Sequence, residues 1–291
     1  MDCFCFVILH YQTKEDTIAC VNSLLTNISY PNIKIIVVDN GSSNNSGAAL
    51  AELYRNNEKI KVISNSKNLG FTDGNNIGFR YAKYQLNADF IALINNDTII
   101  QQQNFVEAVI AKNKTVPFHI LGPDIITFSG VHQNPVFNKL SSLPAVENYI
   151  RHYRKVLFLN YMALDKLLEK LKKFFFPKSN IHIEDIKKEL DHSSEQKGVA
   201  LHGSAIIFSG SYIRYYDGLI PGPFMYGEEA LLDFIVKRDN LISLYSPEIR
   251  ILHKDDSSTN FVYRKALMKR RFYLKNFIRS LKVLQKLMKE E

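Results

Sequence analysis

Apolar runs and amphipathic segments alternate along the first 127 residues. The apolar runs are short and rich in β-branched residues, and the segments between them are long enough for crossover helices, which parallel strand pairs require. This alternation is typical of a mostly parallel sheet covered by helices, so we predict a doubly wound, Rossmann-like α/β core. The expected strands are Cys3–Leu9, Ile33–Asp39, Ile60–Ser64, Phe90–Ile94 and Ile120–Phe128, and the expected helices are Glu15–Thr26, Gly47–Asn56 and Asn75–Tyr84.

The strand pattern is interrupted between about residues 136 and 197. Lys/Phe/Leu-rich sequence of helical character runs from Val146 to Phe176, and a strand pattern returns at Val199–Phe208. Polar motifs continue beyond the interruption. We therefore expect a helical insertion inside one catalytic domain, residues 1–261, instead of a domain boundary.

Residues 262–291 form a basic C-terminal segment with ten Lys/Arg and two Glu, a net charge of +8. Apolar residues recur there at three- and four-residue spacing, which predicts an amphipathic helix. The apolar stripe has two interpretations: it packs on the catalytic domain or on a second subunit, or it lies on an anionic membrane surface. The stripe comprises Leu267, Leu274, Phe277, Ile278, Leu281, Leu284 and Met288.

Composition narrows the class of protein. The 291 residues are 46% hydrophobic, enough for a full core, and the net charge of +8 equals that of the C-terminal segment alone. No base-reading motif accompanies this charge, so a nucleic-acid-binding protein is the weaker interpretation. The three cysteines suggest no disulfide framework, and the sequence pattern indicates neither a signal peptide nor a transmembrane helix of about 18 consecutive apolar residues. We expect a cytoplasmic protein, soluble or peripheral on the inner face of the cell membrane.

Polar residues follow the predicted strands at the edge where parallel sheets bind ligands. His10 follows the first strand, and Asp39 with Asn40 follows the second. A carboxylate at that place can accept hydrogen bonds from a ribose or a base, although Asp-Asn-Gly-Ser is also typical of a turn. Asn65–Gly78 gathers glycines and amides before a predicted helix, which suits an anionic or polyhydroxyl ligand.

Carboxylates elsewhere suit metal binding and acid–base chemistry. Asp97 follows a buried strand, where it could cap a helix or, together with a ligand's phosphates, hold Mg²⁺ or Mn²⁺. Glu228 and Glu229 open a predicted helix; acidic residues are common in a first turn, and one held ionised there can also be a general base. His253 could bind a metal or a phosphate, although a lone histidine is more often structural.

In order and spacing these segments resemble glycosyltransferase family 2, which has the GT-A fold. The likeness covers roughly residues 4–260 apart from the insertion, and it is closest to bacterial members that build capsular polysaccharide or O-antigen, including rhamnosyltransferase-like ones. It rests on "VILHYQT", "IIVVDNGSS", "KNLGFTDGNNIGF", "LINNDT", "GPDII", "LHGSAIIFS", "FMYGEEALL" and "LHKDDSS".

The resemblance implies a role for each segment. Asp97 and His253 would serve a Mn²⁺ or Mg²⁺ ion, Glu229 would be the base with Glu228 as the alternative, and His132, His202 and Gly203 would line the acceptor side. Two departures stand out: Asn95 lies where the family often has a second carboxylate, and Glu229 replaces the usual Asp. The expected donor-binding residues are His10, Asp39, Asn40, Asn68, Gly70, Asn75, Asn76, Asn95 and Asn96.

The implied activity is an inverting transfer from a nucleotide diphosphate sugar, UDP- or dTDP-linked, to a glycan or lipid-linked acceptor in bacterial surface polysaccharide synthesis. A catalytically inactive nucleotide-sugar or glycan-binding relative is the main alternative, and a homo-oligomer is compatible with the sequence. A dinucleotide-binding oxidoreductase is disfavoured because no G-x-G-x-x-G follows the first strand.

Overall fold

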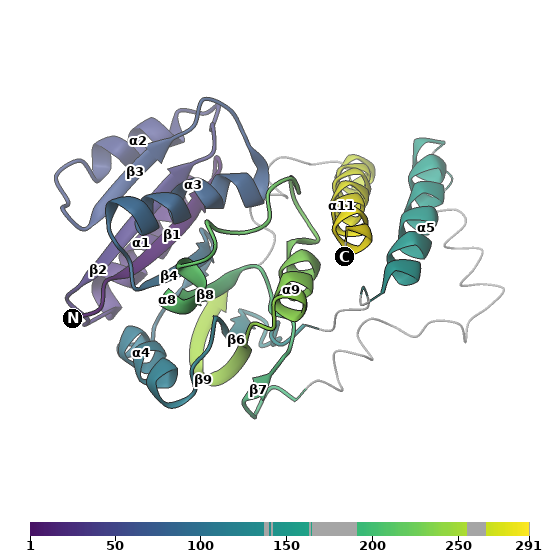
Figure 1. The fold of residues 1–291 in the computed structure, drawn as a ribbon. Coiled ribbons are helices and arrows are strands. Elements are labelled where there is room, and N and C mark those ends of the chain that lie inside the picture. The colour runs from purple at the N-terminus through teal and green to yellow at the C-terminus, as the bar shows by residue number, and fades with distance from the viewer. Residues whose placement is uncertain (137–139, 141, 163, 165–190, 255–265, 291) are drawn as a thin grey trace.

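The computed structural model describes residues 1–136, 140, 142–162, 164, 191–254 and 266–290. Within them the chain forms one mixed sheet with helices on both faces (Figure 1). The strands are β1 Phe4–His10, β2 Ile33–Asp39, β3 Ile60–Ser64, β4 Phe90–Asn95, β5 Thr98–Ile99, β6 Ile120–Thr127, β7 Gln196–Lys197, β8 Ala205–Ser209 and β9 Ser243–His253. The helices are α1 Lys14–Asn27, α2 Ser46–Leu53, α3 Gly70–Gln85, α4 Phe105–Thr115, α5 Leu143–Tyr161, α8 Gly210–Ile213, α9 Glu228–Arg238 and α11 Ala266–Lys289.

The strand order is β3-β2-β1-β4-β8-β6-β9-β5, with β7 paired to β9. The first four strands in this order run parallel, whereas β8 lies antiparallel between β4 and β6. The carboxyl ends of β1, β2 and β4 therefore meet at one edge, as the sequence predicted.

Side chains alternate between the two faces of the sheet, and each face has its own helices. On β1, Phe6 and Ile8 belong to a core cluster with residues of α1, α2 and α4. Cys5 and Val7 point to the other face, where α3, α8 and α9 contribute the partners. This two-sided covering confirms the predicted doubly wound α/β architecture.

Two predicted boundaries were wrong. Helix α3 begins at Gly70, not near Asn75, because Gly70 adopts a φ of +84° and closely approaches Phe224, whose carbonyl oxygen lies 2.2 Å from where a Cβ would stand. Glycines and amides that resemble a loop in the sequence thus form the first turns of a buried helix. Strand β8 begins at Ala205 instead of Val199, which leaves residues 201–204 as a connection at the site edge.

The described part of the insertion packs against the C-terminal helix. Helices α5 and α11 stand side by side, with α11 between α5 and α9 (Figure 1). From the predicted stripe, Leu274, Ile278, Leu281 and Leu284 are each at most 7% exposed, and the latter half of the stripe shares a cluster with residues of α5 and α9. These buried residues cannot lie on a membrane, so the packing interpretation of the stripe is confirmed.

Among the described helices, none is long and apolar enough to cross a bilayer. The Phe174–Phe176 end of the Lys/Phe/Leu-rich segment lies outside the described residues.

Candidate functional site

Five chain segments meet at the carboxyl edge of the sheet. They are the turn after β4, the end of β9, the loop after β6, the connection before β8 and the first turn of α9. The carboxylates and histidines predicted for metal and acceptor all lie on these segments. The fold therefore joins residues that are more than 150 positions apart in the sequence.

Asp97 and His253 form the centre of this cluster. Strand β5 pairs with β9 so that Thr98 lies opposite His253, which brings the His253 Nε2 atom to 3.2 Å from Asp97 Oδ1. Both side chains are buried, at 3% and 5% exposure. The Asp97 carbonyl oxygen also accepts a hydrogen bond from the Lys254 N–H at 3.0 Å, which holds the two strands in place.

The hydrogen bond on the far side of His253 fixes its tautomer. His253 Nδ1 lies 2.7 Å from the Gln133 side-chain oxygen, which can only accept, so Nδ1 carries the proton and neutral His253 presents a lone pair at Nε2. This Nε2 is buried and makes no hydrogen bond of acceptable geometry. A lone pair and a carboxylate oxygen facing each other at 3.2 Å require a cation or a proton between them.

The arrangement fits a divalent cation with few protein ligands. Mg²⁺ and Mn²⁺ are commonly held by one or two side chains, with phosphate oxygens and water completing the shell. The described residues contain no group of three or more His, Cys, Asp or Glu side chains placed for a metal. Asp97 and His253 would thus supply the protein's share, and a phosphate-bearing ligand the rest.

The connection before β8 links this centre to the helix α9. The Ser204 carbonyl oxygen accepts the Asn95 N–H at 2.8 Å, and the Gly203 N–H donates to Glu229 Oε1 at 3.3 Å. A Cβ on Gly203 would lie 3.2 Å from Glu229 Oε1 and 3.3 Å from Glu228 Oε1. Both carboxyl groups therefore reach the same short segment that borders the Asp97 turn.

The two glutamates differ in their surroundings. Glu228 Oε2 is buried and has no hydrogen-bond partner. Burial raises the pKa of the Glu228 carboxyl well above its usual value, and the neighbouring charge of Glu229 raises it further. Glu228 therefore favours its protonated form more than an ordinary glutamate does.

Two histidines occupy the side expected for the acceptor. The ring of His202 lies 6.2 Å from that of His253, and its Nδ1 contacts Ser204 Oγ at 2.9 Å. His132 contacts Asp124 through Nδ1 at 2.7 Å and belongs to the same loop as Gln133. His202 thus lies beside the Asp97–His253 pair and His132 lies against Asp124, and acceptor binding by either remains a prediction.

Asp39 ends β2 two strands away from β4. Its Oδ1 accepts the Ser42 N–H at 3.1 Å, and a Cβ on Gly47 would stand 1.8 Å from Oδ2. Only glycine at position 47 leaves room for this carboxylate. Because strands lie about 4.8 Å apart, the ends of β2 and β4 are about 10 Å apart across β1.

Several residues predicted to contact the donor make hydrogen bonds within the protein. His10 is fully buried, with its ring nitrogens 2.7 Å from Thr17 Oγ1 and 2.8 Å from Ser46 Oγ, and burial lowers its pKa. Asn96 donates to Thr13 Oγ1 and Thr17 Oγ1 at 2.8 and 2.9 Å. These bonds link His10 to α1 and α2 and Asn96 to the start of α1, and a donor contact by either side chain stays a prediction.

The asparagines around α3 likewise make hydrogen bonds within the protein. Asn40 donates to Asn68 Oδ1 and to the Gly70 carbonyl oxygen at 3.0 and 2.9 Å. Asn76 forms a pair of hydrogen bonds with the Leu219 backbone at 2.8 and 2.7 Å, and Asn75 donates to the Phe71 carbonyl oxygen. In the structure these amides pair with groups of the helix start and its neighbours, and donor binding by them stays a prediction.

The first amides of α3 are also occupied. Gly70 N–H donates to Asn68 Oδ1 at 2.8 Å, and Phe71 N–H donates to the Phe224 carbonyl oxygen at 2.6 Å. The predicted anion site at this helix start thus loses two donors. The hydrogen bond from Phe71 to Phe224 instead holds the turn that leads to Glu228 against the start of α3.

Sequence reasoning missed the role of Gln133. It lies 120 positions from His253, and a single glutamine in a loop carries no pattern that indicates its partner. Lys254, which follows His253, was missed as well. Its Nζ forms an ion pair with Asp16 Oδ1 at 2.7 Å.

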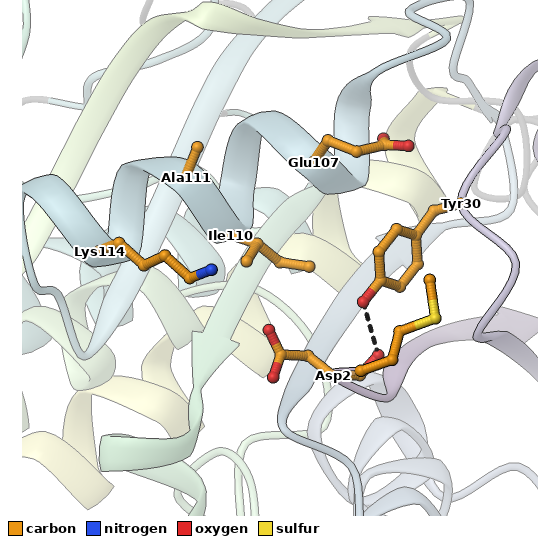
Figure 2. A pocket seen from close by; sticks show the side chains of 7 residues that line it. Asp2, Tyr30, Glu107, Ile110, Ala111 and Lys114 are labelled. Atoms are coloured by element: carbon orange, nitrogen blue, oxygen red, sulfur yellow. Dashed lines mark hydrogen bonds between the residues drawn. The ribbon is translucent and has the colours of Figure 1, made fainter.

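A separate surface pocket lies at the opposite, amino edge of β1 and β2 (Figure 2). Its lining includes Asp2, Tyr30 and Lys114, and the Tyr30 hydroxyl donates to the Asp2 carbonyl oxygen at 2.9 Å. None of the predicted site residues borders it, so we assign it no part in the chemistry.

Comparison with known proteins identifies the family. Residues 5–171 match the model of glycosyl transferase family 2. The chain belongs to this family. The glycosyltransferase fold is also seen in the crystal structure of GalNAc-T7 with UDP, GalNAc and Mn²⁺, which covers 87% of this chain and 44% of its own at 11% identity and a TM-score of 0.56. The predicted GT-A fold is thereby confirmed.

Two glycosyltransferases are among the similar sequences. The low-salt glycan biosynthesis hexosyltransferase Agl10 of Haloferax volcanii is 25% identical over 241 residues, 83% of this chain and 64% of the relative. The glycosyltransferase GlyG of Streptococcus pneumoniae is 28% identical over 99 residues, 34% of this chain and 31% of the relative. This chain thus spans less than two thirds of the length of each.

Proposed function

We propose that this family 2 chain is a metal-dependent, inverting glycosyltransferase that moves a sugar from a nucleotide diphosphate donor to a hydroxyl of a glycan or lipid-linked acceptor. The observation that carries the proposal is the buried Asp97–His253 pair, whose facing atoms, 3.2 Å apart, are placed to share a divalent cation or a proton. Glu229 lies across the short Gly203–Ser204 segment from this pair. A cation held there would stabilise the leaving diphosphate, and a carboxylate base beside it would take the acceptor proton.

The donor would lie along the carboxyl edge of the sheet. Asp39 would accept hydrogen bonds from the nucleoside, and the diphosphate would reach the Asp97 turn, about 10 Å away across β1. Asn95, whose side chain is partly exposed at the end of β4, stays a predicted donor contact between them. A bound divalent cation would neutralise the diphosphate and stabilise it as a leaving group.

Glu229 would act as the general base. It takes the proton of the acceptor hydroxyl as the oxygen attacks the anomeric carbon, and the bond from that carbon to the diphosphate oxygen breaks with its electron pair leaving on the nucleotide. Attack opposite the leaving group inverts the configuration. The raised pKa of the buried Glu228 carboxyl supports Glu229 in this role, because burial favours the neutral form of Glu228, which cannot accept the proton.

The relatives support the substrate class. Agl10 is named a hexosyltransferase of glycan biosynthesis, and the GalNAc-T7 structure contains UDP and Mn²⁺. For this chain we propose a UDP- or dTDP-sugar, Mn²⁺ or Mg²⁺, and a role in bacterial surface polysaccharide synthesis at the cytoplasmic face of the membrane. The acceptor side would include His132, His202 and Gly203.

Calorimetry with UDP, dTDP, NAD and a short RNA, each with and without Mn²⁺, tests this proposal. We expect one nucleoside diphosphate to bind in a Mn²⁺-dependent manner and the other ligands to bind weakly or not at all. Binding of NAD, or nucleotide binding whose affinity is unchanged by Mn²⁺ or EDTA, would contradict the proposal. Asp97→Asn should lose the Mn²⁺-dependent part, whereas Asp89→Asn, at the amino end of β4, is the matched control.

A further inference from the structure

One end of the α5–α11 helix pair exposes large apolar side chains. Phe158, Tyr161, Met162 and Met268 are 65, 49, 58 and 52% exposed. Single exposed apolar residues are common, but here they gather where the end of α5 meets the start of α11. We call residues 151–162 of α5 and its C-cap, together with 267–282 of α11, the basic tip.

The basic tip carries charge of one sign. Its two segments contain nine Lys/Arg and no Asp or Glu. The other end of the same helix pair is balanced, since Glu147 pairs with Lys289 at 3.2 Å and Glu290 pairs with Lys286 at 3.6 Å. The charge imbalance is therefore a property of one end, not of the whole pair.

Contacts between the two helices hold the cations beside the aromatic ring of Tyr161. The Arg271 guanidinium lies 4.1 Å from the centre of this ring, and Lys275 Nζ lies 5.4 Å from it. Arg271 Nε also donates to Asn160 Oδ1 at 3.1 Å, which fixes the end of α5 on α11. Aromatic rings flanked by Lys and Arg, with aliphatic neighbours, are typical of surfaces at the membrane–water interface.

The basic tip adjoins the turn that carries the candidate base. Phe272 contacts Phe224 at a ring distance of 6.2 Å, and Tyr273 contacts Tyr226 at 4.8 Å. Tyr226 immediately precedes Gly227, which caps α9 at Glu228. A partner held at the basic tip would thus lie beside the turn that leads to Glu228 and Glu229.

We infer that the basic tip binds an anionic lipid surface. Its cations match anionic headgroups, and its exposed Phe, Tyr and Met side chains match the apolar boundary below them, which a nucleic acid does not offer. The inference rests on the proposed function only in its consequence, which is that a membrane-borne acceptor would be presented next to Glu229. Membrane binding itself needs no turnover, so it can be tested separately.

Cosedimentation of the full chain with vesicles tests the inference. We expect binding to phosphatidylcholine vesicles that contain phosphatidylglycerol, little binding to pure phosphatidylcholine, and weakening at high salt. Lys155→Glu with Lys275→Glu should weaken binding about 25-fold or more, since each basic residue contributes about fivefold. Lys61→Glu with Lys114→Glu changes the net charge equally at exposed positions on β3 and α4 and should change binding far less.

A second double variant, with a matched control, tests the exposed apolar side chains of the basic tip. Phe158→Ser with Met162→Ser should weaken binding at high salt, where the electrostatic part is screened, whereas Leu53→Ser with Tyr84→Ser removes similarly exposed residues elsewhere and should not. Thermal melts and Mn²⁺-dependent nucleotide binding should match wild type in all four variants, which separates this inference from the proposed function.

Equal binding to neutral and anionic vesicles, or equal loss in the basic-tip and control variants, would overturn the inference. A dimer that the Phe158/Met162 variant dissociates would instead assign the surface to a second copy of the chain. Binding of RNA with higher affinity than anionic vesicles would assign it to nucleic acid.

Discussion

Replacing Gln133 by Leu isolates the contact that orients the proposed metal ligand. Gln133 accepts the His253 Nδ1 proton at 2.7 Å, and His253 is only 3% exposed, so in the variant this N–H would be buried without an acceptor. Such an unpaired group costs about 1–3 kcal/mol. The imidazole can avoid the cost by moving its proton to Nε2, where Asp97 Oδ1 at 3.2 Å would accept it.

That change removes the lone pair that would bind a metal. Loss of a residue that hydrogen-bonds to a metal-binding histidine typically lowers metal affinity by about 10–100-fold, which corresponds to about 1.4–2.7 kcal/mol. We therefore expect Gln133→Leu to bind Mn²⁺ in the presence of UDP at least tenfold more weakly than wild type, with little change in thermal stability. Gln133→Glu keeps an acceptor at the same place and should retain the affinity.

Electron paramagnetic resonance of free Mn²⁺ during a titration measures this affinity without any turnover. Nitrogen-15 NMR of the histidine ring reports the tautomer directly, and the Nδ1-protonated form should give way to the Nε2-protonated form in the Leu variant. Wild-type Mn²⁺ affinity in Gln133→Leu, with the tautomer changed, would refute the assignment of His253 as a metal ligand.

Three further predictions follow from other contacts. Glu229→Gln should lower turnover by about 10² to 10⁴ while nucleotide still binds, whereas Glu228→Gln should stay active because a protonated carboxyl and an amide are similar in shape and charge; the reverse result would move the base to Glu228. Asn76→Ala leaves the Leu219 N–H and carbonyl oxygen unpaired, at about 1–3 kcal/mol each, and should lower stability in urea by about 2–6 kcal/mol, in contrast to Asn56→Ala at an exposed position. Burial lowers the pKa of His10 below its usual 6.5, so the unfolded chain binds more protons and stability should fall as the pH drops below about 6.5; melts of His10→Asn should depend less on pH across this window than those of wild type.

The strands and the ligand-binding edge could be predicted because apolar runs with polar ends identify buried parallel strands. The start of α3 could not, because Gly70, Asn75 and Asn76 have the composition of a loop. Their helical role depends on Phe224 and Leu219, which lie far away in the sequence and supply the backbone groups that these residues contact.

Predictions about single side chains were limited in a similar way. A carboxylate at a strand end such as Asp97 is informative by position, and the structure places it beside His253. A histidine at a strand end such as His10 has the same appearance in the sequence, yet it is buried between Thr17 and Ser46. The apolar stripe of α11 was ambiguous for a physical reason, since burial against α5 and burial in lipid demand the same spacing.

Sugar transfer itself is the most direct test of the account. A panel of UDP- and dTDP-sugars is incubated with the chain and Mn²⁺, and release of the nucleoside diphosphate is measured with and without a glycan acceptor. The account predicts that one donor is turned over, that EDTA abolishes the reaction, and that Asp97→Asn lowers it by orders of magnitude while the fold is kept. Turnover that persists in excess EDTA, or nucleotide binding without turnover of any donor in a broad panel, would contradict it.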